Sequence, residues 1–316
     1  MAKDIRIIGV RSEIGAGTRG ASLGVDAIRI AALNQMSNFF MRYPVEAVET
    51  ENALLFRPVD SPYARRIMGM VTLYERVSAQ VAGVMKDGAF PVILAGDHAT
   101  AGATIAGIRT AWPGARLGVI WIDAHADLHT PYTTPSGNLH GMGVATAFAD
   151  DNLDHCIQRP DLETLRRWDS LKQTGGIAPK LGAGDLVYVA LRDYEPQESR
   201  LIQKYDLPVV GVSELRQKGA WATADRVTTL LKDCELLYIS FDADSLDPQV
   251  SRGTGTPVKG GLLAEEAVLF IARLMQHPGT CCLEIAEVNP TLDDRNKMAE
   301  TAFAILNQSV QARMLR

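Results

Sequence analysis

The sequence predicts an α/β fold in which residues 1–316 form a single domain, with a parallel sheet of about eight strands flanked by helices. Short apolar runs alternate along the chain with longer helix-like stretches, an order typical of βαβ units. The apolar runs are continuous rather than alternating, so we expect strands that are covered on both faces. No Pro/Gly-rich linker interrupts the chain, and 316 residues can enclose one large core.

Strands are expected at the short uninterrupted apolar runs, and helices at the longer stretches between them. In chain order, the expected strands are 5–10, 45–48, 90–94, 117–123, 186–191, 208–212, 236–242 and 281–288. The expected helices are 25–32, 65–86, 100–111, 222–232, 264–275 and 299–313. The stretch 149–184 fits neither pattern, and we expect a lid or a peripheral excursion with its own helix near 161–171.

The overall composition argues against several classes of protein. The net charge is −5 and there is no long basic run, so we expect no nucleic-acid partner. No apolar stretch could span a bilayer, and the N-terminus lacks the apolar core of a secretory signal, so we expect a cytoplasmic protein with no membrane partner. The four cysteines form no C-x-x-C pair, which favours reduced thiols.

Three segments, 94–98, 121–127 and 239–244, begin as apolar strands and end in histidines and carboxylates. In an open α/β sheet, ligands bind beyond the carboxyl ends of the strands, so residues distant in sequence can meet there. Buried carboxylates are costly without a positive partner, and these segments contain no Lys or Arg. We therefore expect bound divalent metal, with six candidate ligands: His98, Asp123, His125, Asp127, Asp242 and Asp244.

The composition of this ligand set indicates the kind of metal. Four carboxylates and two imidazoles suit two divalent ions of hard or borderline character, with at least one carboxylate bridging them. Metals that prefer thiolate ligands are disfavoured, because no cysteine lies near these segments in the sequence. Asp123, His125 and Asp127 alternate, so they face one side if the segment stays extended, and Asp242 and Asp244 repeat this spacing. Water between two ions would have a pKa near about 7. A single such motif would fit a solvated loop equally well, but three at strand ends favour a metal site.

Two loops and one strand end extend the candidate site. Residues 136–141 form a polar loop that carries His140, and residues 253–257 form a Gly-rich loop. Each alone fits an ordinary turn, although glycines also let the backbone approach a ligand closely. Glu287 closes the last expected strand, at the same edge of the sheet as the acidic segments.

Together these motifs resemble the ureohydrolase family, and within it they are most similar to arginase. The resemblance runs over nearly the whole chain, through residues 15–22, 96–98, 123–127, 133–141, 191–193, 240–248, 253–257 and 287–290. It implies an arginase-like fold, two Mn²⁺ ions per subunit, and hydrolysis of a guanidino group to urea and an amine by attack of metal-bound hydroxide.

The resemblance also implies roles for single residues. One manganese ion would be held by His98, Asp123, Asp127 and Asp242, and the other by His125, Asp123, Asp242 and Asp244. His140 would carry a proton to the departing amine, Glu287 would bind the guanidinium, and Asp127 would join them as a catalytic residue. Thr256 would lie beside the reacting centre. This is consistent chemistry, because an amine leaves well only when a group of near-neutral pKa protonates it.

The substrate that the resemblance implies is L-arginine, cleaved to L-ornithine and urea. Arginases bind the amino-acid end of the substrate with polar loop residues, and Ser136, Asn138 and Glu198 match that pattern. His129 stands where arginases usually carry Asn, and Glu195 where they usually carry Asp. These two differences leave open another guanidino compound, such as agmatine or a guanidino acid, or formimidoylglutamate.

Two further alternatives fit the motifs less well. A deacylase of the related deacetylase fold would use one zinc ion and fewer carboxylates, and a non-catalytic protein would not need all six ligands with His140 and Glu287. The resemblance allows a homo-oligomer, but the Arg-Glu pair that joins subunits in many arginases is replaced here by Glu265 and Glu266. Like charges cannot make that bridge, so the number of subunits stays open.

Overall fold

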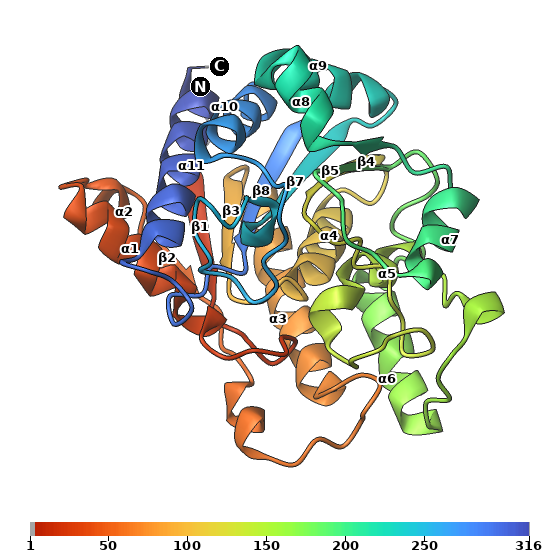
Figure 1. The fold of residues 1–316 in the computed structure, drawn as a ribbon. Coiled ribbons are helices and arrows are strands. Elements are labelled where there is room, and N and C mark those ends of the chain that lie inside the picture. The colour runs from red at the N-terminus through yellow and green to blue at the C-terminus, as the bar shows by residue number, and fades with distance from the viewer. Residues whose placement is uncertain (1–3, 316) are drawn as a thin grey trace.

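The computed structural model describes residues 4–315, which form a single α/β domain around one sheet (Figure 1). The sheet has eight strands in the order β2-β1-β3-β8-β7-β4-β5-β6, and all of its pairs are parallel. The strands are β1 (Ile5–Val10), β2 (Val45–Ala47), β3 (Phe90–Ala95), β4 (Leu117–Ile122), β5 (Leu186–Val189), β6 (Val209–Val210), β7 (Leu236–Asp242) and β8 (Thr280–Ala286). The expected fold class is therefore confirmed.

Several strands end earlier than expected because the backbone turns at their carboxyl ends. β5 stops at Val189 because Ala190 has a left-handed backbone with φ of 66°. β8 stops at Ala286 because Glu287 has a φ of 62°. β6 is only two residues long, since Gly211 leads directly into the following helix.

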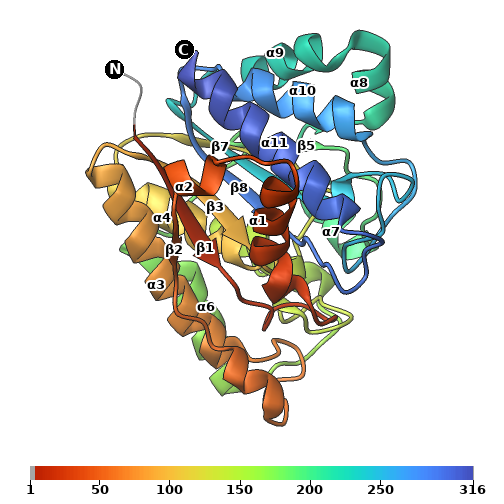
Figure 2. The same cartoon turned by 90° about the vertical axis from the view of Figure 1, so that its left-hand side faces the viewer.

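Helices cover both faces of the sheet (Figures 1 and 2). On one face lie α1 (Gly24–Asn34), α2 (Phe39–Arg42), α8 (Val212–Lys218), α9 (Ala220–Leu230), α10 (Ala264–Met275) and α11 (Lys297–Met314). On the other lie α3 (Ile67–Lys86), α4 (Thr100–Ala111), α5 (Gly143–Phe148), α6 (Leu162–Gln173) and α7 (Pro196–Lys204). Each layer buries its own apolar cluster, for example around Phe270 on the first face and Trp168 on the second.

The six expected helices are present, as α1, α3, α4, α9, α10 and α11. The sequence did not indicate α2, α5, α7 or α8, which have four to nine residues and are too short for a recognisable periodic pattern. Within 149–184, α6 begins after Asp161, whose carboxylate accepts the N–H of Thr164 at 2.9 Å. Its buried Trp168 and Leu171 pack in the helical layer with α3 and α5, so this segment is a peripheral excursion.

Four neighbouring strands in the middle of the sheet, β3, β8, β7 and β4, carry the acidic motifs at their carboxyl ends. Their adjacency brings segments from four distant parts of the chain to one edge of the sheet. Between residues 4 and 315, no helix is both long enough and apolar enough to cross a bilayer.

Candidate metal centre and active site

The acidic segments do not stay extended beyond their strands, so the alternation of their ligands along an extended segment is not what brings them together. β4 ends before Asp123, whose Oδ1 accepts the N–H of His125 at 2.7 Å. Asp242 Oδ1 likewise accepts the N–H of Asp244 at 2.7 Å. Asp127 then adopts a left-handed backbone with φ of 51°. Local turns of this kind, in which an aspartate bonds the backbone two residues on, make the carboxylates converge.

The first ligand group surrounds Nδ1 of the buried His98. This nitrogen lies 3.0 Å from Asp123 Oδ2, 3.1 Å from Asp242 Oδ2 and 3.3 Å from Asp127 Oδ2, yet it has no partner in hydrogen-bond geometry. Ligand atoms at right angles around an ion, each about 2.1 Å from it, lie about 3.0 Å apart. The spacing and the donor types therefore fit a divalent ion.

The second ligand group lies around His125. Its Nδ1 is 3.0 Å from Asp244 Oδ2 and 3.5 Å from Asp123 Oδ1, so Asp123 faces both groups with its two oxygens. Asp244 Oδ2 also accepts the hydroxyl of Thr256 at 3.0 Å. The side chain of His125 is 26% exposed, so this group lies nearer to solvent than the first. The expected bridging role of Asp242 stays a prediction: its Oδ2 lies 3.1 Å from His98 Nδ1 in the first group, and its Oδ1 accepts the backbone N–H of Asp244.

The carboxylates of these groups have no Lys or Arg partner among residues 4–315. Arg192, the nearby cation, donates to the backbone carbonyl of Asp244 at 2.7 Å and not to a carboxylate. Burial and the neighbouring carboxylates raise the pKa of Asp242 and Asp244, and raise that of Asp127 to about 6. Burial would lower the pKa of His98, but the surrounding carboxylates outweigh it and raise that pKa. Bound cations would relieve this repulsion.

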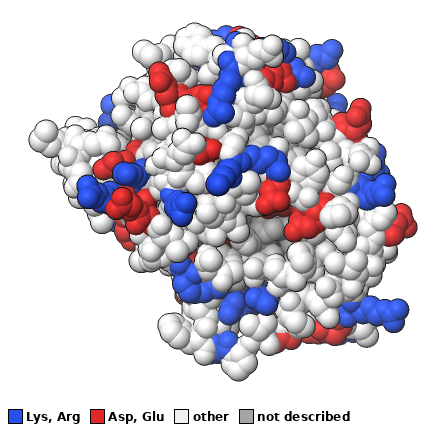
Figure 3. All heavy atoms as spheres, viewed as in Figure 1, with Lys and Arg blue, Asp and Glu red and all other residues white. Residues whose placement is uncertain are grey.

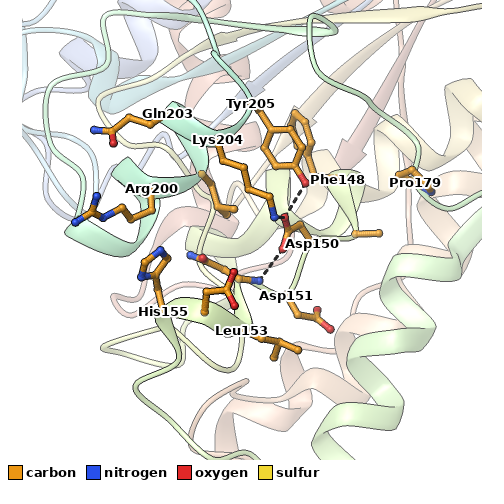
Figure 4. A pocket seen from close by; sticks show the side chains of 14 residues that line it. Phe148, Asp150, Asp151, Leu153, His155, Pro179, Arg200, Gln203, Lys204 and Tyr205 are labelled. Carbon is orange, nitrogen blue, oxygen red and sulfur yellow. Dashed lines mark hydrogen bonds and ion pairs between the residues drawn. The ribbon is translucent and has the colours of Figure 1, made fainter.

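A cavity of about 770 Å³ lies elsewhere in the molecule. It is formed between the loop 149–155 and α7 (Figure 4). Two of the three carboxylates that line it have cationic partners, since Lys204 Nζ is 2.6 Å from Asp150 Oδ2 and Lys172 Nζ is 2.8 Å from Asp151 Oδ1. The third, Asp154, is exposed to solvent rather than buried. The unneutralised carboxylates, and not the cavity size, therefore identify the candidate site.

A smaller cavity of about 120 Å³ opens on the two ligand groups. All of the expected catalytic, substrate and metal residues line it except Asp123 and Glu287. Asp123 and Glu287 each contact a residue that does line it, since Asp123 Oδ2 is 3.0 Å from His98 Nδ1 and Glu287 Oε1 is 3.0 Å from His140 Nδ1. Figure 3 shows acidic side chains beside a hollow near the middle of one face of the molecule.

His140 and Glu287 form a pair at the wall of this cavity. His140 Nδ1 lies 3.0 Å from Glu287 Oε1, which also accepts the N–H of His98 at 3.0 Å. Burial opposes the charged imidazole, but the hydrogen bond and charge of Glu287 outweigh it and raise the pKa of His140 to about 9. In turn, His140 lowers the pKa of Glu287 despite burial. His140 is therefore protonated at neutral pH and can act as an acid.

Asp97, which is fully buried, supports the backbone beside His140. Its Oδ2 accepts the N–H of Gly15 at 2.9 Å, and the carbonyl of Gly15 accepts the N–H of His140 at 3.2 Å. Asp97 Oδ1 accepts the N–H of Ala99 at 3.1 Å. A Cβ at Gly15 would lie 2.8 Å from the Cβ of Ala99, so the close approach of these segments requires glycine.

Ser136 and Asn138 lie on either side of Gly137 in the loop that leads to His140. Gly137 has a φ of 75°, and a Cβ there would collide with the carbonyl oxygen of Pro62. The loop is held because the carbonyl of Gly137 accepts the N–H of Arg65 at 2.8 Å. This contact fixes both polar side chains at the wall of the cavity.

The two residues that depart from the expected substrate pattern contact each other. His129 Nε2 lies 3.0 Å from Glu195 Oε2, and this hydrogen bond lowers the pKa of Glu195 to about 2. Glu198 is buried and accepts the N–H groups of Leu128 and Glu195, each at 3.0 Å. Burial raises the pKa of Glu198, so the ionised carboxylate at this end of the cavity is that of Glu195.

Two residues behind the ligands were not expected from the sequence. Trp121 Nε1 donates to Asp123 Oδ2 at 3.0 Å, and its ring stacks on His98 with the centroids 4.2 Å apart. Ser240 Oγ lies 2.8 Å from His98 Nε2. Each residue precedes a ligand aspartate by two positions. The alternation of side chains along a strand is the signal that could have found them.

Comparison with known proteins agrees with this geometry. The family model described as "Arginase family" matches residues 3–310. The chain is 31% identical to the arginase of Bacillus caldovelox over 308 residues, which are 96% of this chain and 97% of that protein. It is 32% identical to the arginase of Brevibacillus brevis over 319 residues, 97% of each protein. The crystal structure of arginase from Bacillus subtilis matches with a TM-score of 0.80 at 30% identity and covers 98% of each chain. The chain belongs to the arginase family.

Proposed function

We propose that the protein hydrolyses the guanidino group of L-arginine to give L-ornithine and urea, with two Mn²⁺ ions per subunit as cofactors. One observation carries the proposal: two ligand groups share Asp123 and open, together with His140, on one cavity. Similarity to arginases over almost the whole chain supports the same reaction.

The donor atoms suit manganese, because carboxylate oxygens with a few imidazoles favour such ions over thiolate-bound metals. His98, Asp123, Asp127 and Asp242 would hold one ion, and His125, Asp123, Asp242 and Asp244 would hold the other. When bound, two such ions supply Lewis acidity and lower the pKa of water enough to provide hydroxide at neutral pH.

Glu287 is suited to orient the guanidinium. Its Oε1 is occupied by His140 and by the N–H of His98, whereas its Oε2 accepts no hydrogen bond from the residues described. A buried carboxylate that receives the N–H groups of a guanidinium fixes its orientation as well as its position.

His140 is suited to protonate the amine that leaves. It is held between Glu287 and the carbonyl of Gly15, and it lines the cavity beside the ligand groups. Its pKa is raised to about 9, so the protonated, acid form of His140 predominates at neutral pH.

The His129–Glu195 pair is suited to recognise the head of an α-amino acid. A substrate carboxylate can replace Glu195 beside His129, with Ser136 and Asn138 as further donors, and an α-ammonium can replace His129 beside Glu195. Agmatine lacks the carboxylate and would leave these donors unpaired, at about 1–3 kcal/mol for each buried group.

The proposal is tested by urea release from purified protein with added Mn²⁺, using L-arginine, agmatine and a guanidino acid without an α-amino group. Formamide release from formimidoylglutamate and amide hydrolysis by a zinc-loaded sample cover the remaining alternatives. We expect L-arginine to be the best substrate. A higher rate with agmatine or the guanidino acid would contradict the substrate, while the ureohydrolase reaction would stand.

We also propose that the protein is a cytoplasmic homo-oligomer. Its subunits would be joined without the Arg-Glu bridge that many arginases use. Glu266 is already paired with Arg216 of the same chain, at 2.9 Å, and the neighbouring Glu265 is exposed. Light scattering of the purified protein across a range of concentrations measures the number of subunits, and a monomer throughout would contradict this proposal.

A further inference from the structure

A row of buried side chains crosses the sheet beneath His98. Trp121 on β4 pairs in register with Ser240 on β7, and Ser240 pairs in register with Glu284 on β8. Residues in register on neighbouring strands point to the same face, and Tyr238, two positions before Ser240, also points there. All four side chains are completely buried. The strand register therefore places a carboxyl group and a phenol behind the candidate metal centre.

These side chains form an unbroken chain of contacts to His98. His98 Nε2 lies 2.8 Å from Ser240 Oγ, and Ser240 Oγ lies 3.1 Å from the hydroxyl oxygen of Tyr238. That hydroxyl lies 2.8 Å from Glu284 Oε2, which also accepts the hydroxyl of Thr104 at 2.5 Å. The chain thus runs from a candidate metal ligand to a carboxyl group on another strand.

One arrangement of hydrogens along this chain of contacts leaves His98 ready to bind a metal ion. Glu284 Oε2 is an acceptor, so the single hydroxyl hydrogen of Tyr238 is donated to it. With its one hydrogen given to Glu284, Tyr238 can accept the hydrogen of Ser240, and Ser240 can then accept the N–H at Nε2 of His98. A proton on Glu284 Oε1, which has no partner, would leave this direction unchanged. Nδ1 is then a bare lone pair that faces the carboxylates of the first ligand group.

We propose that Tyr238 and Glu284 are positioning residues of the metal centre, which act through Ser240 to hold His98 with Nδ1 as the ligand atom. The inference rests on the metal-binding part of the proposed function. A buried carboxyl without a cationic partner generally destabilises a fold, so the fold alone does not explain why Glu284 and the Tyr238 hydroxyl are buried here. Partners of this kind raise the affinity of a histidine for its metal, typically by about 10- to 100-fold.

The test is Mn²⁺ titration of metal-free protein, with free Mn²⁺ followed by its paramagnetic resonance signal, and no activity measurement is needed. Tyr238→Phe removes one oxygen atom and breaks the chain, and Glu284→Gln keeps the shape but weakens the acceptor. Tyr74→Phe is the matched control, since Tyr74 is also buried and its hydroxyl contacts Thr146, which is not a candidate ligand.

We expect Tyr238→Phe and Glu284→Gln each to lower the affinity for one of the two Mn²⁺ ions by about tenfold or more. Because both act through the same chain, the double variant should bind that ion no more weakly than Tyr238→Phe alone. Denaturant unfolding of the metal-free proteins should show that Tyr238→Phe and Tyr74→Phe change the free energy of unfolding by similar amounts. This is the result expected if Tyr238 chiefly supports the metal centre and not the fold.

Three results would overturn the inference. The first is unchanged Mn²⁺ affinity in Tyr238→Phe, the second is an equal loss of affinity in Tyr74→Phe, and the third is an additive loss in the double variant. If Glu284→Gln does not fold, Tyr238→Phe and its control still decide the question. Wild-type protein that binds no Mn²⁺ would instead contradict the proposed function, and the inference with it.

Discussion

The imidazole Nε2 of His129 lies 3.0 Å from Oε2 of Glu195, so the two residues that depart from the usual arginase pattern form a pair at the head end of the cavity. The pair joins the loop after β4 to the start of α7, 66 positions apart in the sequence. Glu195 is half-exposed, so a substrate head that reaches the pair can compete for this hydrogen bond.

Changing this pair should alter substrate preference. Both His129→Asn and Glu195→Asp should raise kcat/KM for L-arginine relative to agmatine, because each frees one member for the zwitterionic head. We expect a shift of about tenfold, the equivalent of one well-formed hydrogen bond. The measurement is urea release with both substrates, with Glu163→Asp on the distant α6 as the control. An unchanged ratio in both variants would show that the pair does not contact the substrate.

Removal of metal should abolish activity. The reason is that the carboxylates of the two ligand groups have no other cation to neutralise them in the described chain. A chelator followed by dialysis should leave protein without urea release, and Mn²⁺ should restore the rate better than Mg²⁺ or Zn²⁺. Full activity in protein shown by atomic absorption to be metal-free would refute this.

Among the ligands, replacement of Asp123 or Asp242 by Ala should be the most damaging. Asp123 faces both ligand groups, and Asp242 is expected to bridge them as well. We expect kcat/KM to fall by more than about a hundredfold, which exceeds the loss that mutation of residues hydrogen-bonded to metal ligands typically causes. Both metal ions should be lost as well. Metal content and urea release are measured together. Asp150→Ala, in the large cavity beside α7, should leave both unchanged.

Replacement of His140 by Ala should slow turnover but spare the metal. His140 lies against Glu287 and is not part of either ligand group, and loss of a general acid typically costs about a hundredfold or more. Added imidazole should restore part of the rate. The exposed His155 provides the matched control, as His155→Ala. A wild-type rate in His140→Ala would make His140 a structural residue only.

The same histidine should make the stability of metal-free protein depend on pH. Burial opposes its charge, yet Glu287 raises the pKa of His140 from 6.5 to about 9 in the folded state. Its ion pair therefore stabilises the fold fully below about pH 6.5, and this contribution is lost as pH rises through about 9. Urea unfolding of wild type and His140→Asn should show a difference at about pH 6 that shrinks by about pH 9.5. A difference that stays constant with pH would contradict the assignment.

The sequence by itself determined the fold class and the candidate ligands, because both are written in short local patterns. Continuous apolar runs indicate buried parallel strands wherever they occur, and residues such as His98 and Asp242 follow those runs directly. The rule that parallel strands end at one edge then sufficed to bring the motifs together. Whether 123–127 stays extended was left open by the sequence; it does not, because the carboxylate of Asp123 bonds the backbone of His125 and turns the chain.

Only the tertiary structure decided which side chains support the ligands and which face the substrate head. Alternation could place Ser240 on the ligand face of its strand, but its contact with His98, 142 positions away, depends on tertiary packing. Likewise, Glu284 meets Thr104 across 180 positions through strand register and helix packing that no local pattern encodes. His129 meets Glu195 because α7, too short to show a periodic signal, is packed beside the loop after β4. Such contacts depend on how buried surfaces fit together over the whole domain, and the chemistry of a single segment does not fix them.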